Sequence, residues 1–95
     1  MPQVLVIEDH PLFRQALVQV LRSTLGAEAM LCGTAEEGLD QLARTPQIDL
    51  VVMDLGLPGP LRGCEAVRAV RQAAQVPVLV MSGSDEADTM EETLA

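Results

Sequence analysis

The sequence predicts an α/β domain with a doubly wound parallel sheet, and three observations support this fold class. Short apolar runs without a polar interruption recur along the chain, as in strands that are buried on both faces. Each run is followed by a segment in which apolar residues return at helical spacing. Glycine, proline and capping residues separate these segments. Strands that alternate with helices form right-handed βαβ units, so the strands are expected to pair in parallel.

The first strand is expected over residues 4–7, and the first helix begins at Pro11. Proline suits a first helical position because its missing N–H is not needed there. The helical spacing predicts a buried face made of Leu12, Phe13, Ala16, Leu17, Val20 and Leu21. We expect Phe13, the single aromatic residue, to pack between this helix and the sheet. Gly26 is expected to end the helix.

A shorter second strand is expected over residues 29–32. After it, Thr34 and Glu37 form a capping-box pattern, in which both side chains satisfy free N–H groups at the start of a helix. Pro46 is expected to end this second helix, and a third strand follows over residues 48–53.

The alternation continues after the third strand. Residues 56–60 are rich in glycine and proline, so we expect a non-helical loop there. The inner side of a third helix is indicated by Ala66, Val67 and Val70. A fourth strand is expected over residues 76–81, with Pro77 at its start, where a missing donor is tolerated.

A last helix is expected near the end of the chain. Ser84 can cap it, and its apolar positions are Ala87, Met90 and Leu94. The chain stops within this helix, so the sequence predicts one domain, residues 1–95, that is incomplete at its C-terminal end.

Composition excludes several classes of function. The formal net charge of −8 argues against direct binding to nucleic acid or to anionic membranes and favours basic partners or bound cations. Cys32 and Cys64 lack a CxxC spacing and His10 is the only histidine, so free thiols are expected rather than a zinc site. No leader or membrane-spanning segment is apparent, and we expect a cytoplasmic protein.

Acidic residues follow two of the predicted strands. Glu8 and Asp9 come directly after the first strand, and Asp54 comes directly after the third. By itself, Asp54 is equally well explained as a loop residue that caps a turn and as a reactive group in the crevice at the carboxyl ends of the strands. If the two strands are neighbours, three carboxylates converge, and their repulsion must be relieved by a cation or by raised pKa values.

Magnesium is the natural cation for such a cluster, because it takes hard oxygen ligands together with phosphate oxygens. A carboxylate beside the metal is a plausible nucleophile toward phosphorus. Ser82, at the end of the fourth strand, is placed to donate its hydroxyl to a phosphoryl oxygen.

These motifs, in this order, resemble the receiver domain of two-component response regulators, which has a flavodoxin-like fold. The resemblance rests on residues 4–9, 54–59 and 78–83 and covers the whole chain. Residues 8–14, with the sequence EDHPLFR, are most similar to the subclass that is joined to a helix-turn-helix output domain.

The resemblance implies a role for each matching position. Asp54 is the residue that accepts a phosphoryl group from a histidine kinase, and Ser82 is the switch hydroxyl. Asp9 binds Mg²⁺ directly, Glu8 binds it through water, and the backbone carbonyl of Gly56 is a further ligand. The domain catalyses at most its own phosphorylation and controls a DNA-binding output domain that this chain does not contain. His10 is expected to be a solvated loop residue without a catalytic role.

The chain departs from the family pattern at its C-terminal end. The family has a fifth strand with a lysine at its end and a final helix, whereas this chain contains no lysine and stops earlier, which is explained by truncation or by degeneracy of the site. The fourth strand would then be an uncovered edge, so we expect self-association as a homodimer or by segment exchange. The alternative function is a receiver-like interaction module that works without phosphorylation.

Overall fold

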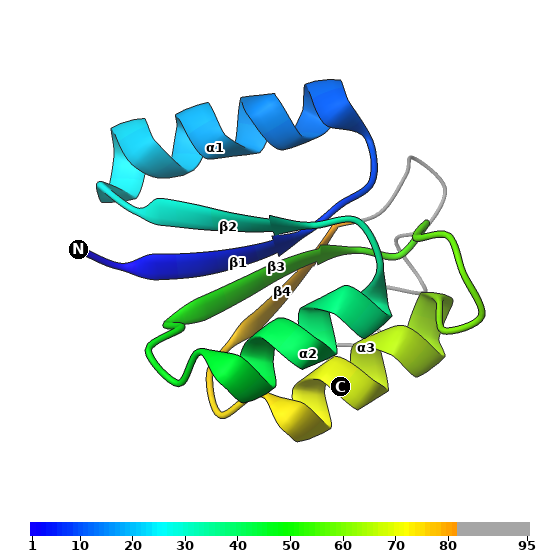
Figure 1. The fold of residues 1–95 in the computed structure, drawn as a ribbon. Helices are drawn as coiled ribbons and strands as arrows, with labels where there is room; N and C mark the ends of the chain where they lie inside the picture. Colours follow the sequence, from blue (N-terminus) through cyan, green and yellow to red (C-terminus); the bar gives the residue numbers. More distant parts are fainter. Residues whose placement is uncertain (82–95) are drawn as a thin grey trace.

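The computed structural model describes residues 1–81 of the chain (Figure 1). These residues form a 4-stranded parallel sheet with the strand order β2-β1-β3-β4. The strands are β1 (Gln3–Ile7), β2 (Glu28–Cys32), β3 (Leu50–Asp54) and β4 (Val78–Met81). The helices are α1 (Pro11–Leu25), α2 (Ala35–Arg44) and α3 (Gly63–Ala73).

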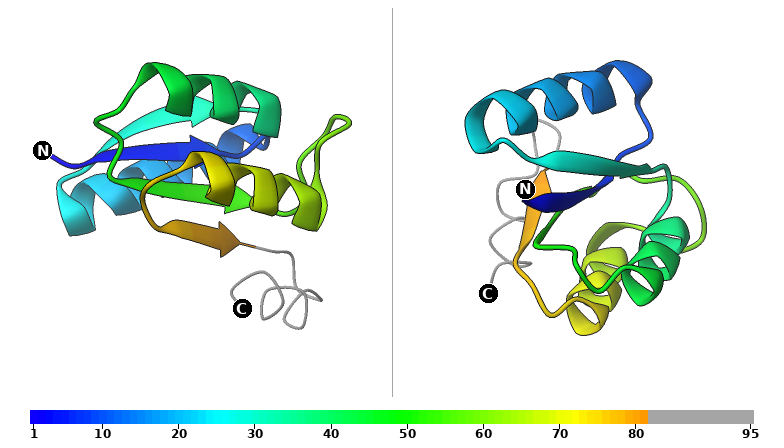
Figure 2. Two further views of the ribbon diagram at one scale, coloured as in Figure 1. Left: turned by 90° about the horizontal axis from the view of Figure 1, so that it is seen from below. Right: turned by 60° about the vertical axis from the view of Figure 1, so that its left-hand side comes forward.

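Helices cover both faces of the sheet. Figures 1 and 2 show α1 on one face and α2 with α3 on the other. β1 lies between β2 and β3. The chain therefore adds β2 on one side of β1 and then crosses over to add β3 and β4 on the other side. This arrangement confirms the predicted doubly wound parallel sheet.

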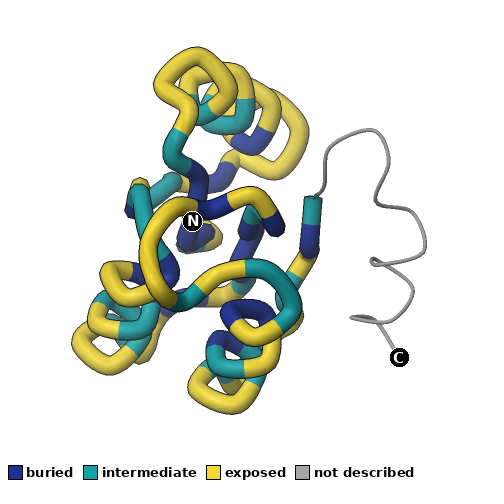
Figure 3. The backbone as a smooth tube through the Cα atoms, turned by 90° about the vertical axis from the view of Figure 1, so that its right-hand side faces the viewer, coloured by how far each residue is buried: buried dark blue, intermediate teal, exposed yellow. Residues whose placement is uncertain are grey.

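Alternating side chains of the strands build a core on each face. Under α2 and α3 the core includes Leu5, Ile7, Val51, Met53, Val67 and Val80. Under α1 it consists of Val4, Val6, Leu21, Ala27 and Val52. Figure 3 shows that burial is concentrated in the strands, whereas the outer sides of the helices are exposed. The apolar runs are therefore buried on both faces, as their lack of polar interruption predicts.

Local signals determine both ends of α1 and the start of α2. Pro11 occupies the first turn of α1, and Gly26 caps its C-terminus in the left-handed conformation with φ of 60°. The Thr34 hydroxyl accepts a hydrogen bond from the Glu37 N–H at 3.1 Å. The Glu37 carboxylate accepts from the Gly33 N–H at 2.7 Å, one residue earlier than in an ideal capping box.

Two strands begin later than expected. β3 starts at Leu50 rather than at residue 48, because the buried Ile48 still donates its N–H to Thr45 in the turn after α2. β4 starts at Val78 rather than at residue 76, where pairing with β3 begins. Apolar character alone predicts burial and leaves the start of the ladder undetermined.

The expected packing of Phe13 is wrong. Its side chain is 45% exposed, and Leu12 and Val20 are also exposed. Phe13 is four residues before Leu17 and continues the i, i+4 row of Leu17 and Leu21, but only Leu17 and Leu21 pack into the core under α1. Phe13, in the first turn of the helix, lies outside that core. The apolar stripe of α1 thus extends beyond its contact with the sheet.

Some expectations lie outside the described residues. Ser82 and the predicted last helix belong to residues 82–95, for which no structure is described. Both cysteines in the described part are free, and burial raises the pKa of the Cys32 thiol. Within residues 1–81, no helix has the length and apolar character needed to cross a bilayer.

Gly38 permits the close approach of α2 to β1. A methyl group added at Gly38 would overlap Cδ1 of Ile7 and lie 2.9 Å from its Cγ1. We expect Gly38→Ala to lower the free energy of unfolding by about 1 to 3 kcal/mol, because overpacking outweighs the gain in helix propensity. Urea unfolding followed by circular dichroism measures this change.

Ile7→Val provides the control, since valine lacks the Cδ1 atom. On its own this substitution is expected to cost about 1 kcal/mol. The double variant should be more stable than the sum of the two single effects, and simple additivity would contradict the proposed contact.

Candidate functional site

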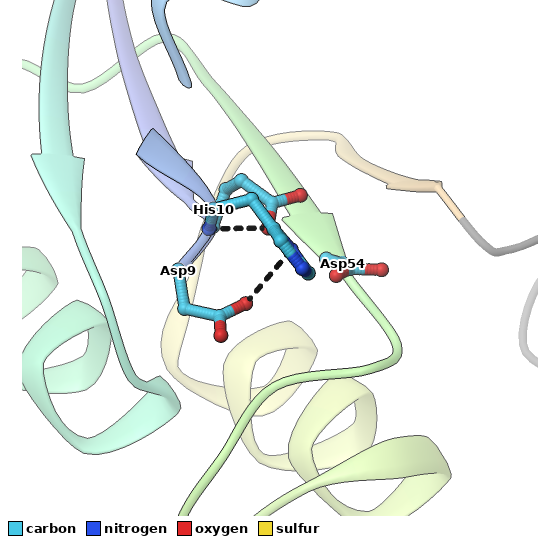
Figure 4. Close-up of side chains that lie close together, drawn as sticks. Asp9, His10 and Asp54 are labelled. Atoms are coloured by element: carbon cyan, nitrogen blue, oxygen red, sulfur yellow. Dashed lines mark hydrogen bonds and ion pairs between the residues drawn. The ribbon is translucent and has the colours of Figure 1, made fainter. Parts of the chain in front are cut away.

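Acidic side chains meet at the carboxyl ends of two neighbouring strands. β1 and β3 pair in parallel with Ile7 opposite Met53, so Glu8 and Asp9 leave the sheet beside Asp54. One donor atom from each of Glu8, Asp9, His10 and Asp54 lies within 4.8 Å of the others. Figure 4 shows the Asp9, His10 and Asp54 side chains gathered at this edge. The structure therefore brings together the three carboxylates that the sequence predicted to converge.

Glu8 is completely buried and is held from several sides. Its N–H donates to the Cys32 carbonyl at 2.9 Å. Its carboxylate Oε2 accepts from the His10 N–H at 3.1 Å and lies 3.2 Å from His10 Nδ1. Oε1 is buried and has no hydrogen-bond partner within residues 1–81. A buried carboxylate oxygen without a partner is costly, so this atom is suited to bind a cation or to accept a hydrogen bond.

Asp9 also has an oxygen without a partner. Its side chain is one third exposed, but Oδ1 is buried and forms no hydrogen bond in the part of the chain that the structure describes. The same oxygen lies 3.5 Å from His10 Nδ1. Two unsatisfied carboxylate oxygens at one edge of the sheet suit a divalent cation, and carboxylate oxygens are the ligands that Mg²⁺ prefers.

Asp54 ends β3 and faces the loop that follows. Its Oδ1 accepts a hydrogen bond from the Gly56 N–H at 3.2 Å. A Cβ atom at Gly56 would lie 3.5 Å from Asp54 Oδ2, so the backbone of the loop passes close to this carboxylate. Asp54 does cap a turn, as one of the two original interpretations held. The cap uses one oxygen only, so the other interpretation is compatible with it.

His10 is exposed, as expected for a loop residue, but its ring takes part in the acidic cluster. The hydrogen bond to Glu8 raises the pKa of His10 above 6.5, and the negative charges of Asp9 and Glu8 raise it further. The sequence position next to two acids was the available signal for this contact. It did not show that the ring turns back toward them.

Two further residues hold the site in place and were not predicted. Arg14, on α1, donates from Nε to the backbone carbonyl of Glu8 at 2.6 Å. Glu36, in the first turn of α2, accepts at Oε2 from the Leu61 N–H at 3.2 Å and so connects α2 to the loop after β3. The Glu36 contact joins residues that are 25 positions apart, whereas Arg14 reaches back to the strand end six residues before it, and the apolar spacing reveals neither contact.

The contact of His10 with Glu8 predicts an elevated histidine pKa in the metal-free protein. Because His10 is the only histidine, a proton NMR titration gives this value without ambiguity. We expect a pKa above 6.5 that falls toward 6.5 in Glu8→Gln, with a smaller fall in Asp54→Asn, since the Asp54 charge is the weakest of the raising causes. A wild-type pKa at or below 6.5 would contradict the contact.

The raised pKa of His10 also determines how its contribution to folding stability changes with pH. A group whose pKa is raised on folding stabilises the fold fully below its unfolded pKa of about 6.5. The contribution of His10 is therefore lost as the pH rises through the folded pKa.

Comparison with known proteins gives relatives at the level of sequence. The KDP operon transcriptional regulatory protein KdpE of Escherichia coli is 40% identical over 92 residues, which are 93% of this chain and 38% of the relative. The protein-glutamate methylesterase/protein-glutamine glutaminase of Nitrosospira multiformis is 33% identical over 87 residues, which are 90% of this chain and 24% of that protein. The chain thus spans well under half of either relative, and their names describe different outputs.

A solved structure has the same fold. The receiver domain of a sensor histidine kinase from Pseudomonas aeruginosa, which has a magnesium ion coordinated in its active-site cleft, aligns with a TM-score of 0.76. The alignment covers 97% of this chain and 78% of the other, at 23% identity, so the likeness shows the fold alone.

The family profile described as "Response regulator receiver domain" matches residues 4–95. This match includes every strand end that contributes to the acidic site. The chain therefore belongs to the family of response regulator receiver domains.

Proposed function

We propose that this domain is a phosphorylatable signalling switch in which Asp54 accepts a phosphoryl group from a histidine kinase. The observation that carries the proposal is the pair of buried, unpartnered oxygens on Glu8 and Asp9 beside the Asp54 carboxylate. Such oxygens suit a divalent cation, and a carboxylate beside a cation is suited to attack phosphorus.

The residues at the site fit Mg²⁺ in distinct ways. Asp9 and Asp54 would bind it through carboxylate oxygens, and Glu8, which is more deeply buried, would act through water. The Gly56 carbonyl would add a backbone ligand. The ion would neutralise the charge of the incoming phosphoryl group, which three carboxylates would otherwise repel. The magnesium-containing receiver domain from Pseudomonas aeruginosa supports this choice of metal.

The turn after β3 supports the assignment of Asp54 as the acceptor. The Gly56 N–H holds Oδ1, so Oδ2 is the oxygen that would attack phosphorus. The new bond is Asp54 O–P, and the bond that breaks joins phosphorus to the imidazole nitrogen of the kinase, which leaves with its electron pair. Ser82, outside the described residues, stays a predicted donor to a phosphoryl oxygen.

The partners of the switch are proposals of the same kind. We assign a sensor histidine kinase as phosphodonor and a transcription-regulating output, which KdpE and residues 8–14 support. Because another relative is a methylesterase, the kind of output domain is itself a question for experiment. No direct contact of this domain with nucleic acid is proposed, since its formal net charge is −8. Location in the cytoplasm stays a prediction.

Substitution of Asp54 tests the proposed function. With Mg²⁺ and radiolabelled acetyl phosphate, the wild-type chain should incorporate phosphate, and Asp54→Asn should reduce incorporation by at least about a hundredfold, because the nucleophile is lost. Asp49→Asn is the matched control. Asp49 lies just before β3, at the opposite end of the strand, and hydrogen-bonds to Gln3.

The alternative, an interaction module that works without phosphorylation, predicts a different result. Two results together would favour that alternative. The folded wild-type chain would take up no phosphoryl group, and the NMR chemical shifts of Glu8, Asp9 and Asp54 would not change when Mg²⁺ is added. Incorporation that persists in Asp54→Asn would place the acceptor elsewhere.

Self-association through β4 is a second proposal on partners. Within residues 1–81, β4 pairs only with β3 and lies at an edge of the sheet. Its Leu79 side chain is 53% exposed, and edge strands with apolar side chains pair with other chains. Light scattering at high protein concentration should show a dimer or larger species. Leu79→Lys should shift it toward the monomer, whereas Leu12→Lys on α1 should not, and a monomeric wild type would contradict the proposal.

A further inference from the structure

We propose that His10 is a nitrogen ligand of the metal site, so that the site binds ions such as Ni²⁺ and Zn²⁺ more tightly than Mg²⁺. The inference rests on the proposed metal site at Glu8, Asp9 and Asp54. It revises the expectation, drawn from the cysteine pattern, that zinc-type ions have no site in this chain.

The geometry places the imidazole among the carboxylates. His10 Nδ1 lies 3.2 Å from Glu8 Oε2 and 3.5 Å from Asp9 Oδ1. Ligands at adjacent positions around an ion with bonds of about 2.1 Å are about 3.0 Å apart, and ligands at opposite positions are about 4.2 Å apart. The donors of the cluster lie within 4.8 Å of one another, so small adjustments bring all of them to one ion.

A second observation indicates a ligand between these groups. The fully buried Glu8 has one oxygen, Oε1, without a partner, and Asp9 Oδ1 is in the same condition within residues 1–81. The His10 backbone N–H donates to the other oxygen of Glu8, Oε2, and this bond remains when Nδ1, without its proton, ligates an ion. An ion bound by Asp9 and Asp54 would satisfy what the imidazole leaves unpaired.

Ligand chemistry then separates two classes of ion. Mg²⁺ takes oxygen ligands and retains its waters, so a nearby imidazole adds little to its affinity. Imidazole suits Ni²⁺, Zn²⁺ and Cu²⁺, whose affinity for mixed nitrogen and oxygen sites is also intrinsically higher. The addition of His10 to three carboxylates therefore shifts the preference of the site toward transition metals.

A different role for His10 would have the opposite consequence. If the ring served only as a counter-ion for Glu8 and Asp9, it would compete with every cation. Its removal would then strengthen the binding of Mg²⁺ and of Ni²⁺ alike. The sign of the change on removal of His10 therefore distinguishes a ligand from a competitor.

The test is metal titration of the full chain without a histidine tag. Isothermal calorimetry with Mg²⁺ and with Ni²⁺, at about pH 8, which is above the ordinary histidine pKa of about 6.5, should give a lower dissociation constant for Ni²⁺. His10→Ala should raise the Ni²⁺ dissociation constant about tenfold or more and change that of Mg²⁺ less than about twofold. Gln15→Ala, an exposed position on α1, is the matched control and should change neither.

Nuclear magnetic resonance gives a readout that is independent of affinity. Zn²⁺ is diamagnetic, and saturation with it should shift the Nδ1 resonance of His10. Excess Mg²⁺ should displace Ni²⁺, because both ions occupy the same carboxylates. In Asp9→Asn, binding of both ions should weaken.

Each contrary outcome has one meaning. If His10→Ala leaves the Ni²⁺ affinity unchanged, or strengthens the binding of both ions, the inference fails while the Mg²⁺ site of the proposed function stands. If Ni²⁺ binding survives Asp9→Asn undiminished, the ion binds to His10 alone and the inference also fails. If Mg²⁺ does not bind to the wild-type chain at all, the proposed function loses its metal.

Discussion

Burial of the Glu8 carboxylate is the constraint on which the rest of the site depends. Among residues 1–81 it is the one charged side chain that is buried, and it comes directly after four buried apolar residues of β1. Removal of a carboxylate from water costs on the order of several kcal/mol unless partners replace the water. His10 provides such partners for the Glu8 carboxylate, at Oε2, whereas the bond to the Cys32 carbonyl and the bond from Arg14 Nε satisfy the Glu8 backbone.

These partners compensate the burial only in part, and this incompleteness gives the site its chemistry. A fully satisfied carboxylate would be a structural feature of the core. Here Oε1 of Glu8 and Oδ1 of Asp9 are left without partners next to Asp54. The pairing of β1 with β3 makes the juxtaposition unavoidable, since Glu8, Asp9 and Asp54 all emerge at the same end of the sheet. The same strand pairing therefore builds the hydrophobic core and concentrates negative charge.

In the loop after β3, Asp54 has both a structural role and a proposed chemical role. Asp54 accepts the Gly56 N–H, which shapes the turn and orients the carboxylate. Glu36 holds the distal part of the same loop from α2. Asp54 and Gly56 are thus positioned from both sides by the framework of strands and helices, and the loop needs no regular structure of its own.

Local chemistry by itself determined a large part of this protein. Apolar runs, Pro11, Gly26 and the Thr34 cap act on neighbouring residues, so the order of strands and helices and the convergence of Glu8, Asp9 and Asp54 could be predicted from the sequence. Only the tertiary structure decided the side-chain environments. Phe13 is exposed, although it continues the row of Leu17 and Leu21, because the apolar core under α1 does not extend to the first turn of that helix. The contact of Glu36 depends on how α2 packs beside the loop after β3, and the contacts of His10 and Arg14 with Glu8 depend on how the chain turns after β1, neither of which the apolar pattern encodes.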